Sequence, residues 1–445
     1  MEYYIENKIG QTSIASIKDG DMNSFTVEQF HNKTNVGAVY VARVKEVNKA
    51  QSMAILSLGN FDAVLNNFNK LTEGQTLLVQ VIRDGFMDKM PAVHTRIVLE
   101  NRFFKISNNG KGFGFDKQAG NGKVKSILEG LGAKVVGSND GVVIKTTAVD
   151  IEESTLKKSY DELKKSHTEI LATKLGKVGL VKDAMGLIEN TVINSLVGSA
   201  FVTDCLETLQ TLKTLKKSNS DIVVKEFKKG NLFNEAGISE VVDELLERKV
   251  SLDGGGDIVI DETEALIAID VNASDLKTMK KGDDAIFKLN KRAAVAIAKQ
   301  IVLRNLSGLI VIDFVRLKNR GMAKQLPKIL KAELQKIDIN GTFDVMDLTK
   351  TGLVEMTRKR TSPSISEILQ TPIKPRGKNN ITVGLELLQK VITLNGAGTP
   401  TVYAGTNVIY TLQNGDLSDM TKEIEKRINK EIKFIVDTKI GVELK

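Results

Sequence analysis

Apolar and polar positions alternate in short runs over the first hundred residues. Residues 1–35 alternate in this way and predict a hairpin. Residues 36–100 hold five short apolar runs, and a strand spacing of about 8–12 residues is typical of a small barrel or sandwich. A five-stranded OB-fold fits a segment of this length.

The pattern changes after residue 100. Residues 101–185 contain a Gly-rich stretch, a strand that begins at GVVI, and a charged helix; the Gly-rich stretch has no GK[ST] ending, so we expect a flexible loop there. Residues 186–250 are predicted to be mostly helical, with a strand near 221–227. Residues 368–380 carry two prolines and predict a linker, and residues 381–445 predict a small α/β unit.

Two apolar stretches between residues 251 and 367 each end on an aspartate. They read IVIDETEALIAIDVN at 258–272 and GLIVIDFVR at 308–316, and both predict buried strands. A helix near 283–305 is predicted to join them, because Ile286, Asn290, Ala293, Ile297 and Ile301 fall on one helical face.

The acidic residues at these strand ends are the candidate chemistry. Asp270 and Asn272 are two apart and share one face of an extended chain, and Asp313 stands at the equivalent point of the second stretch. A carboxylate beside so much apolar surface must be paired, hydrogen-bonded or bound to a metal. Oxygen ligands suit Mg²⁺. The alternative is that these residues cap strands or pair with nearby Lys and Arg.

Composition narrows the classes of partner. The chain has 445 residues, 63 basic against 55 acidic, with a net charge of +8, which favours a polyanionic partner over a merely solvated basic surface. Cys205 is the only cysteine and the three histidines lie far apart, so neither a disulfide framework nor a Cys- or His-based zinc site is expected. The polar N-terminus and the lack of an apolar run of about 18 residues predict a cytoplasmic protein without a membrane span.

Residues 251–366 resemble the catalytic core of the ribonuclease E/G family in three long stretches: GGGDIVIDETEALIAIDVNAS, NLSGLIVIDFVRL and TGLVEMTRKRTSPSISE. The resemblance implies an α/β (α+β) multidomain fold. It implies an RNase H-like subdomain (1–35 and 186–250) that is interrupted by an OB-fold RNA-binding module (36–100) and a 5′-sensor subdomain (101–185). A DNase I-like catalytic subdomain (251–367), the linker and a small C-terminal domain (381–445) then follow.

The resemblance also assigns roles to residues. It implies that Asp270 and Asp313 hold one Mg²⁺ per subunit, that Asn272 orients the site, and that the products carry 5′-phosphate and 3′-hydroxyl ends. Basic residues that follow the strands are candidates to hold the RNA backbone, with solvated charge as the alternative; they are Arg316, Lys318, Arg320, Arg358, Lys359 and Arg360.

The sequence departs from the family pattern in the regions that bind and sense RNA. The stretch SISEILQTPIKPRGKNN has no cysteine, so no zinc is expected and any homo-oligomer is not zinc-linked. Lys145 and Thr146 stand at the Arg-Thr pair of the 5′ sensor, and Thr342 at its further Arg. Lysine lacks the bidentate fork of arginine, so weak sensing is expected.

The OB-fold module departs as well. Ile55 and Val64 stand where the family stacks bases on phenylalanines, while Lys89 aligns with a basic RNA contact. Phe61 is close in sequence, and core packing is its expected role. Loss of base stacking, worth about 1–3 kcal/mol per base, predicts lower RNA affinity.

These observations predict a Mg²⁺-dependent endoribonuclease specific for single-stranded RNA, acting in RNA processing, including rRNA, and in mRNA decay. The alternative is an RNA-binding protein of the same fold with little or no cleavage. An unrelated Mg²⁺ phosphotransfer enzyme is disfavoured because no P-loop is present. The chain ends at residue 445, so no long disordered scaffold tail is expected.

Overall fold

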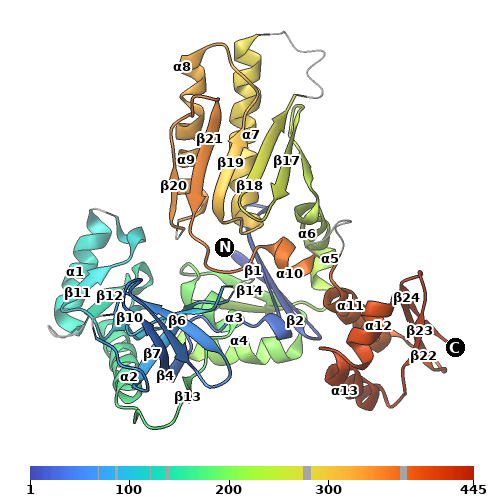
Figure 1. The fold of residues 1–445 in the computed structure, drawn as a ribbon, viewed down its shortest axis with the longest axis horizontal. Coiled ribbons are helices and arrows are strands. Elements are labelled where there is room, and N and C mark those ends of the chain that lie inside the picture. Colours follow the sequence, from blue (N-terminus) through green and yellow to red (C-terminus); the bar gives the residue numbers. More distant parts are fainter. Residues whose placement is uncertain are drawn as a thin grey trace. The chain divides into compact units, whose positions relative to one another are not determined.

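The computed structural model describes residues 1–68, 70–85, 89–120, 122–136, 141–273, 282–339, 341–370 and 378–445, apart from the side chains of residues 32 and 117. It shows a mixed α/β protein with five sheets (Figure 1). The chain forms two compact units. The first contains residues 1, 34–201 and 210–224, and the second contains residues 2–33, 202–209 and 225–445.

A small β-barrel forms the first half of unit one. Its sheet has the order β13-β4-β5-β6-β8-β7, and a further pairing between β4 and β7 closes it, as the sequence predicts for a small barrel. Alternating residues such as Val44, Leu56 and Val79 point inward and are buried. The strands are β4 (Val39–Asn48), β5 (Met53–Ser57), β6 (Asp62–Asn66), β7 (Thr76–Arg83), β8 (Ala92–His94) and β13 (Gly179–Lys182).

The second half of unit one is a sheet of order β11-β12-β10-β9 with helices packed on it. The predicted Gly-rich loop contains β11, which pairs in parallel with β12, so residues 113–115 form a strand where the sequence predicts a loop. Helix α2 buries Leu156, Tyr160 and Leu163 in the core. The elements are β9 (Val98–Glu100), β10 (Phe104–Ser107), β11 (Phe113–Phe115), η2 (Lys117–Ala119), α1 (Lys123–Val135), β12 (Gly141–Ile144), η3 (Thr146–Ala148), α2 (Glu153–Leu171) and α3 (Leu187–Asn194).

The chain's N-terminus forms three strands, where the sequence predicts a two-stranded hairpin. Turns at Gly10 and at Asp19–Gly20, which have positive φ angles, divide the segment into antiparallel strands. The sheet has the order β15-β14-β1-β2-β3. Its elements are β1 (Glu2–Lys8), β2 (Gln11–Lys18), β3 (Asp21–Gln29), η1 (Phe30–Asn32), β14 (Ala200–Thr203), α4 (Leu206–Ser218), β15 (Val223–Glu226), α5 (Leu232–Glu235), α6 (Ile238–Leu246) and α10 (Ile365–Leu369).

A six-stranded sheet of order β16-β17-β18-β19-β21-β20 holds the two aspartate stretches. The sequence predicts a single strand over residues 258–272, and this prediction is wrong. Strands β17 and β18 instead form an antiparallel hairpin around residues 263–266. Strands β18 and β19 are parallel, and β19 is antiparallel to β21. The strands are β16 (Lys249–Ser251), β17 (Asp257–Glu262), β18 (Ile267–Asn272), β19 (Gly308–Asp313), β20 (Phe343–Val345) and β21 (Leu353–Arg358).

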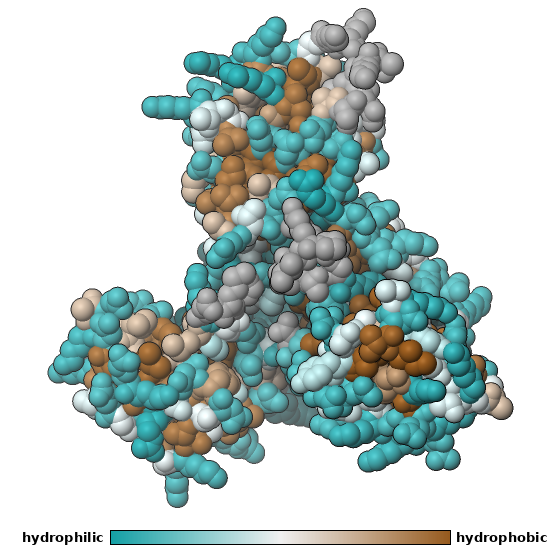
Figure 2. Space-filling view, turned by 45° about the vertical axis from the view of Figure 1, so that its right-hand side comes forward, coloured by the Kyte–Doolittle hydropathy of each residue, from teal (hydrophilic) through white to brown (hydrophobic). Residues whose placement is uncertain are grey.

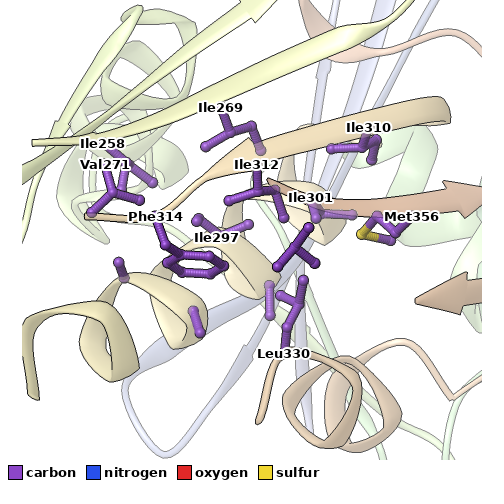
Figure 3. Close-up of a cluster of buried hydrophobic side chains, with 14 of the residues drawn as sticks. Ile258, Ile269, Val271, Ile297, Ile301, Ile310, Ile312, Phe314, Leu330 and Met356 are labelled. Carbon is purple, nitrogen blue, oxygen red and sulfur yellow. The ribbon is translucent and has the colours of Figure 1, made fainter. Parts of the chain in front are cut away.

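Helices α7 (Asp283–Leu303) and α9 (Leu326–Ile337) cover one face of this sheet, and α8 (Arg320–Ala323) precedes α9. The predicted helix near 283–305 is confirmed, with Ala293, Ile297 and Ile301 fully buried. Figure 3 shows Ile297 and Ile301 of α7 beside Ile310 and Ile312 of β19. The same side chains therefore form the core and fix which face of the sheet stays open.

The C-terminal part is a small α/β unit, as predicted, with a sheet of order β23-β22-β24. Its core contains Leu388, Val402, Leu412 and Ile424. Most of the predicted linker, residues 371–377, lies outside the described residues. The elements are α11 (Asn380–Thr393), β22 (Pro400–Ala404), α12 (Thr406–Gln413), α13 (Ser418–Ile428), β23 (Lys433–Val436) and β24 (Gly441–Leu444).

Hydrophilic residues cover most of the face drawn in Figure 2, and apolar residues form separate patches there. Among the helices of the described residues, none combines the length and the apolar character that a membrane crossing requires.

Candidate active site

The sheet β16–β21 has two chemically different faces. Alternate residues of β17, β18, β19 and β21 point into the core against α7 and α9. The residues between them point to the opposite face, where Asp270 and Asp313 are exposed and Asn272 and Glu355 are half-buried. Polar side chains near the strand ends are therefore gathered on one accessible surface.

Asp270 and Asp313 are register partners on the parallel strands β18 and β19. Neighbouring strands lie about 4.8 Å apart, so the two carboxylates share one small region. Within the described residues neither carboxylate accepts a hydrogen bond, although Asp270 interacts electrostatically with Arg248. Two adjacent carboxylates repel each other, and a cation between them relieves this repulsion.

Asp270 and Asp313 suit Mg²⁺, which takes few of its ligands from the protein, better than a metal whose ligands all come from protein side chains. No group of three or more Asp, Glu, His or Cys that could hold a metal occurs in the described part of the chain. Mg²⁺ usually binds through one or two carboxylates and keeps waters or substrate phosphates as its other ligands. Asp270 and Asp313 supply such a two-carboxylate set.

Asn272 is held from the neighbouring strand by Asp257. The two residues are register partners, and Asn272 Nδ2 donates to Asp257 Oδ1 at 3.3 Å. Asp257 is 4% exposed, and its Oδ2 lies 3.0 Å from Lys249 Nζ. The amide of Asn272 therefore has a fixed partner on its β17 side.

The glycine run before β17 is required by close packing. Gly256 has φ +92°, and a Cβ there would lie 2.6 Å from Leu289 and 2.8 Å from the carbonyl oxygen of Asn272. Arg292 of α7 donates to the carbonyls of Gly254 at 2.9 Å and Gly255 at 3.1 Å. The loop that leads into Asp257 is thus fixed against α7.

The positively charged side chain of Arg248 interacts with carboxylates of the open face. Arg248 donates to both carboxylate oxygens of Asp261, each at 2.6 Å. The pKa of the Arg248 guanidinium is raised by this hydrogen bonding and by the charge of Asp261, and the charge of Asp270 adds to the effect. The open face therefore carries positive as well as negative charge.

The three basic residues after β19 are exposed. Arg316 and Lys318 lie between the end of β19 and helix α8, and Arg320 is the first residue of α8. Asp283, at the start of α7, accepts from the backbone N–H groups of Lys318 at 3.4 Å and Asn319 at 2.6 Å. The backbone of this loop is fixed while its basic side chains remain accessible.

Arg358 and Arg360 have partners inside the protein. Arg358 lies in a buried ion pair with Asp338 at 2.7 Å and donates to the Asn305 side chain at 2.9 Å. Arg360 donates to both oxygens of Glu367 at 3.0 and 2.7 Å. These contacts assign structural roles, so we do not propose either arginine as an RNA contact.

The predicted 5′-end residues are also engaged within the protein. Lys145 is buried, with its Nζ 3.1 Å from Glu100 Oε2 and 3.0 Å from Asn194 Oδ1. The backbone N–H and Oγ1 of Thr146 donate to Asp116 Oδ2 at 2.9 and 3.2 Å. Internal carboxylates thus occupy the donors that a terminal phosphate would need.

Burial and the neighbouring charges shift the pKa values of Lys145 and Glu100 in opposite directions. Burial lowers the pKa of Lys145, and the charge of Glu100 opposes this only in part. Burial acts to raise the pKa of Glu100, but the charges of Lys145 and Lys105 outweigh it, so the net pKa is lowered. The pair is therefore an internal ion pair at neutral pH.

The barrel presents aliphatic side chains at the expected base-stacking positions. Ile55 and Val64 are half-buried cross-strand partners on β5 and β6. Phe61 packs against the barrel core, edge-on to Tyr40 with ring centroids 5.6 Å apart. Lys89 is exposed. Lys89 is thus accessible to a ligand, while Phe61 is committed to the core.

An open α/β face with paired carboxylates beside basic loops is typical of metal-dependent enzymes that act on phosphate esters. Comparison with known proteins agrees with this class. The Ribonuclease E/G family profile matches residues 99–361, more than half of the chain. The chain belongs to the ribonuclease E/G family, which identifies it as an endoribonuclease.

Relatives match over nearly the whole chain. Ribonuclease G of Salmonella typhimurium is 26% identical, covering 96% of this chain and 95% of its own. Ribonuclease G of Escherichia coli K12 is 25% identical with the same coverage. The chloroplastic Ribonuclease E/G-like protein of Arabidopsis thaliana is 27% identical over 69% of this chain and 32% of its own.

Sequence reasoning missed Asp257, Lys249 and Glu100. Asp257 pairs with Asn272 only because β17 and β18 fold as a hairpin, and a hairpin centred on residues 263–266 would have predicted that pairing. Glu100 contacts Lys145 from a different strand, and no local spacing signals this contact.

Proposed function

We propose that this endoribonuclease uses Mg²⁺ to hydrolyse single-stranded RNA, in RNA processing and mRNA decay. The observation that carries the proposal is the register pairing of Asp270 with Asp313 on the open face of the sheet. Two carboxylates at adjacent register positions repel each other, and neither accepts a hydrogen bond from the described residues, so a cation bound between them would relieve the repulsion.

Asp270 and Asp313 would bind the ion, and Asn272, held by Asp257, would hydrogen-bond beside them. Mg²⁺ bound there would activate a water and neutralise the charge that builds on the scissile phosphate. In the reaction the water oxygen bonds to phosphorus, the bond to the 3′ oxygen breaks, and that oxygen takes up a proton. The products then carry 5′-phosphate and 3′-hydroxyl ends.

RNA would be held mainly through its phosphates. Arg316 and Lys318 are exposed beyond β19, and Lys89 is exposed on unit one. Ile55 and Val64 offer no aromatic surface for stacking, so the affinity rests on charge. We propose single-stranded RNA as the substrate because a flexible strand can place a phosphate at the open face.

We also propose that the 5′ end of the RNA has little influence on the rate. Lys145 and Thr146 already bind Glu100, Asn194 and Asp116. A terminal phosphate would have to displace these internal acceptors. We propose as well that the chain contains RNase H-like, OB-fold, 5′-sensor and DNase I-like subdomains. We further propose that the protein acts in the cytoplasm and that any homo-oligomer it forms has no zinc link.

The test is cleavage of an AU-rich, internally labelled single-stranded RNA with and without Mg²⁺. We expect internal cuts that require Mg²⁺ and that are lost in Asp270→Asn but kept in Asp344→Asn. Asp344 is a matched control, because it is an exposed carboxylate on β20 of the same sheet that pairs with Lys331. RNA binding without cleavage in the wild type would instead support a non-cleaving RNA-binding protein.

A further inference from the structure

A chain of three polar side chains crosses the open face from its edge to the candidate site. Lys249 of β16 pairs with Asp257 of β17 at 3.0 Å, and Asp257 accepts from Asn272 of β18 at 3.3 Å. Asn272 lies two residues beyond Asp270 on the same face of β18. The contacts thus run from Lys249 toward the paired carboxylates.

We propose that Asp257 is a positioning residue for the reaction, acting through Asn272; this rests on the proposed Mg²⁺-dependent cleavage. An ionised carboxylate only accepts hydrogen bonds, so it selects the Nδ2 end of the Asn272 amide. The amide cannot flip without placing its oxygen against Asp257. The oxygen and the second N–H of Asn272 are thereby held in one orientation for the site.

The burial of Asp257 supports a role beyond folding. Its side chain is 6% exposed while that of its partner Lys249 is 61% exposed. A buried carboxylate is costly to desolvate, and apolar residues often replace buried ion pairs without loss of stability. A carboxylate at this position is useful where the polarity of its neighbour matters. The ammonium of Lys249, 3.0 Å away, supplies the counter-charge to this carboxylate.

The experiment compares Asp257→Asn with Asp344→Asn in the full chain. Asp257→Asn keeps the size of the side chain but removes the acceptor-only group, and Asp344→Asn removes an exposed carboxylate from the same face of the same sheet. We expect Asp257→Asn to lower kcat for RNA cleavage about 10–100-fold, as loss of a residue behind a ligand typically does, with KM little changed. Asp344→Asn is expected to match the wild type.

Two further readouts separate positioning from simple stability. In an Asn272→Ala background, Asp257→Asn is expected to add little, because both changes remove the same interaction. The side-chain NH₂ signal of Asn272 in metal-free protein, seen by NMR with ¹⁵N-labelled asparagine, should exchange slowly with water in the wild type. It should exchange faster and shift in Asp257→Asn.

An unchanged kcat in folded Asp257→Asn would overturn the inference. So would an equal loss of kcat with and without Asn272, or a wild-type Asn272 NH₂ signal that exchanges as fast as that of an exposed asparagine. The last measurement needs neither a variant nor activity. If the wild type shows no Mg²⁺-dependent cleavage, the proposed function fails, and a slow-exchanging NH₂ signal would still establish the contact separately.

Discussion

The side-chain amide of Asn290 holds both backbone polar groups of Val315. Its Nδ2 donates to the Val315 carbonyl at 2.8 Å, and its Oδ1 accepts from the Val315 N–H at 3.1 Å. Asn290 is fully buried on α7, and Val315 lies two residues beyond Asp313. A core helix thus fixes the point at which the chain leaves the sheet beside the candidate site.

Asn290→Ala should therefore destabilise the protein and weaken catalysis. It leaves the N–H and the carbonyl of the partly buried Val315 without their partners, at about 1–3 kcal/mol each. We expect urea unfolding to show a free energy of unfolding lower by about 2–6 kcal/mol. Lys291→Ala, at an exposed position on the same helix, serves as the control. Equal stability of the two variants would contradict the role given to Asn290.

Arg358 should contribute to the stability of the fold, whereas Arg316 should contribute to RNA binding. Arg358→Ala leaves Asp338 buried without its counter-charge, so we expect a loss of about 3–5 kcal/mol in unfolding free energy. Arg316 is exposed, so Arg316→Ala should keep stability but lower RNA affinity and reduce the salt slope of binding by about 0.7. Fluorescence anisotropy over a salt series measures the RNA affinity of each variant, and urea unfolding measures its stability. Normal stability of Arg358→Ala would refute its structural role.

The Lys145–Glu100 pair should make stability depend on pH in the acid range. The folded pKa of Glu100 is lowered, so its contribution is present above its unfolded pKa and is lost as pH falls through the folded pKa. The unfolding free energy of the wild type should therefore decrease on acidification from neutral pH. Burial lowers the pKa of Lys145, which acts only on the alkaline side.

Glu100→Gln should show a shallower decrease over the same acid range, with chemical unfolding at several pH values as the measurement. Glu153→Gln is a suitable control, because Glu153 forms an exposed ion pair with Lys134 in the same unit. The same acid dependence in Glu100→Gln as in the wild type would show that the pair does not stabilise the fold.

Cleavage rates should be similar for 5′-monophosphate and 5′-hydroxyl RNA of one sequence. Lys145 and Thr146 are bound to internal acceptors, so a terminal phosphate gains little there. Single-turnover rates of the two substrates measure this directly. A preference of about tenfold for the monophosphate, or about 1.4 kcal/mol, would show that the end is still sensed.

The pattern of apolar residues in the sequence predicts much of the fold. It predicts the small barrel, the strands that end at Asp270 and Asp313, and the buried face of the helix that joins them. It does not tell a hairpin from one strand in residues 258–272, because an apolar run bounded by polar residues fits both. The pairing of Asp257 with Asn272 depends on that distinction.

Charged residues were harder to assign from the sequence. Arg316 follows the apolar strand β19 and Arg358 ends the apolar strand β21, yet Arg316 is exposed and Arg358 pairs with Asp338, twenty positions earlier in the chain. Lys145 likewise pairs with Glu100 of another strand. Residue type and local spacing are the same for a phosphate contact and for an internal ion pair, and only tertiary packing separates them.

The most direct test of the central claim is metal binding by the Asp270–Asp313 pair. Mn²⁺ binding, followed by electron paramagnetic resonance or calorimetry, should show one site per chain in the wild type and in Asp344→Asn. Asp313→Asn should lose that site together with Mg²⁺-dependent RNA cleavage. An Asp313→Asn protein that binds Mn²⁺ and cleaves RNA like the wild type would contradict the account.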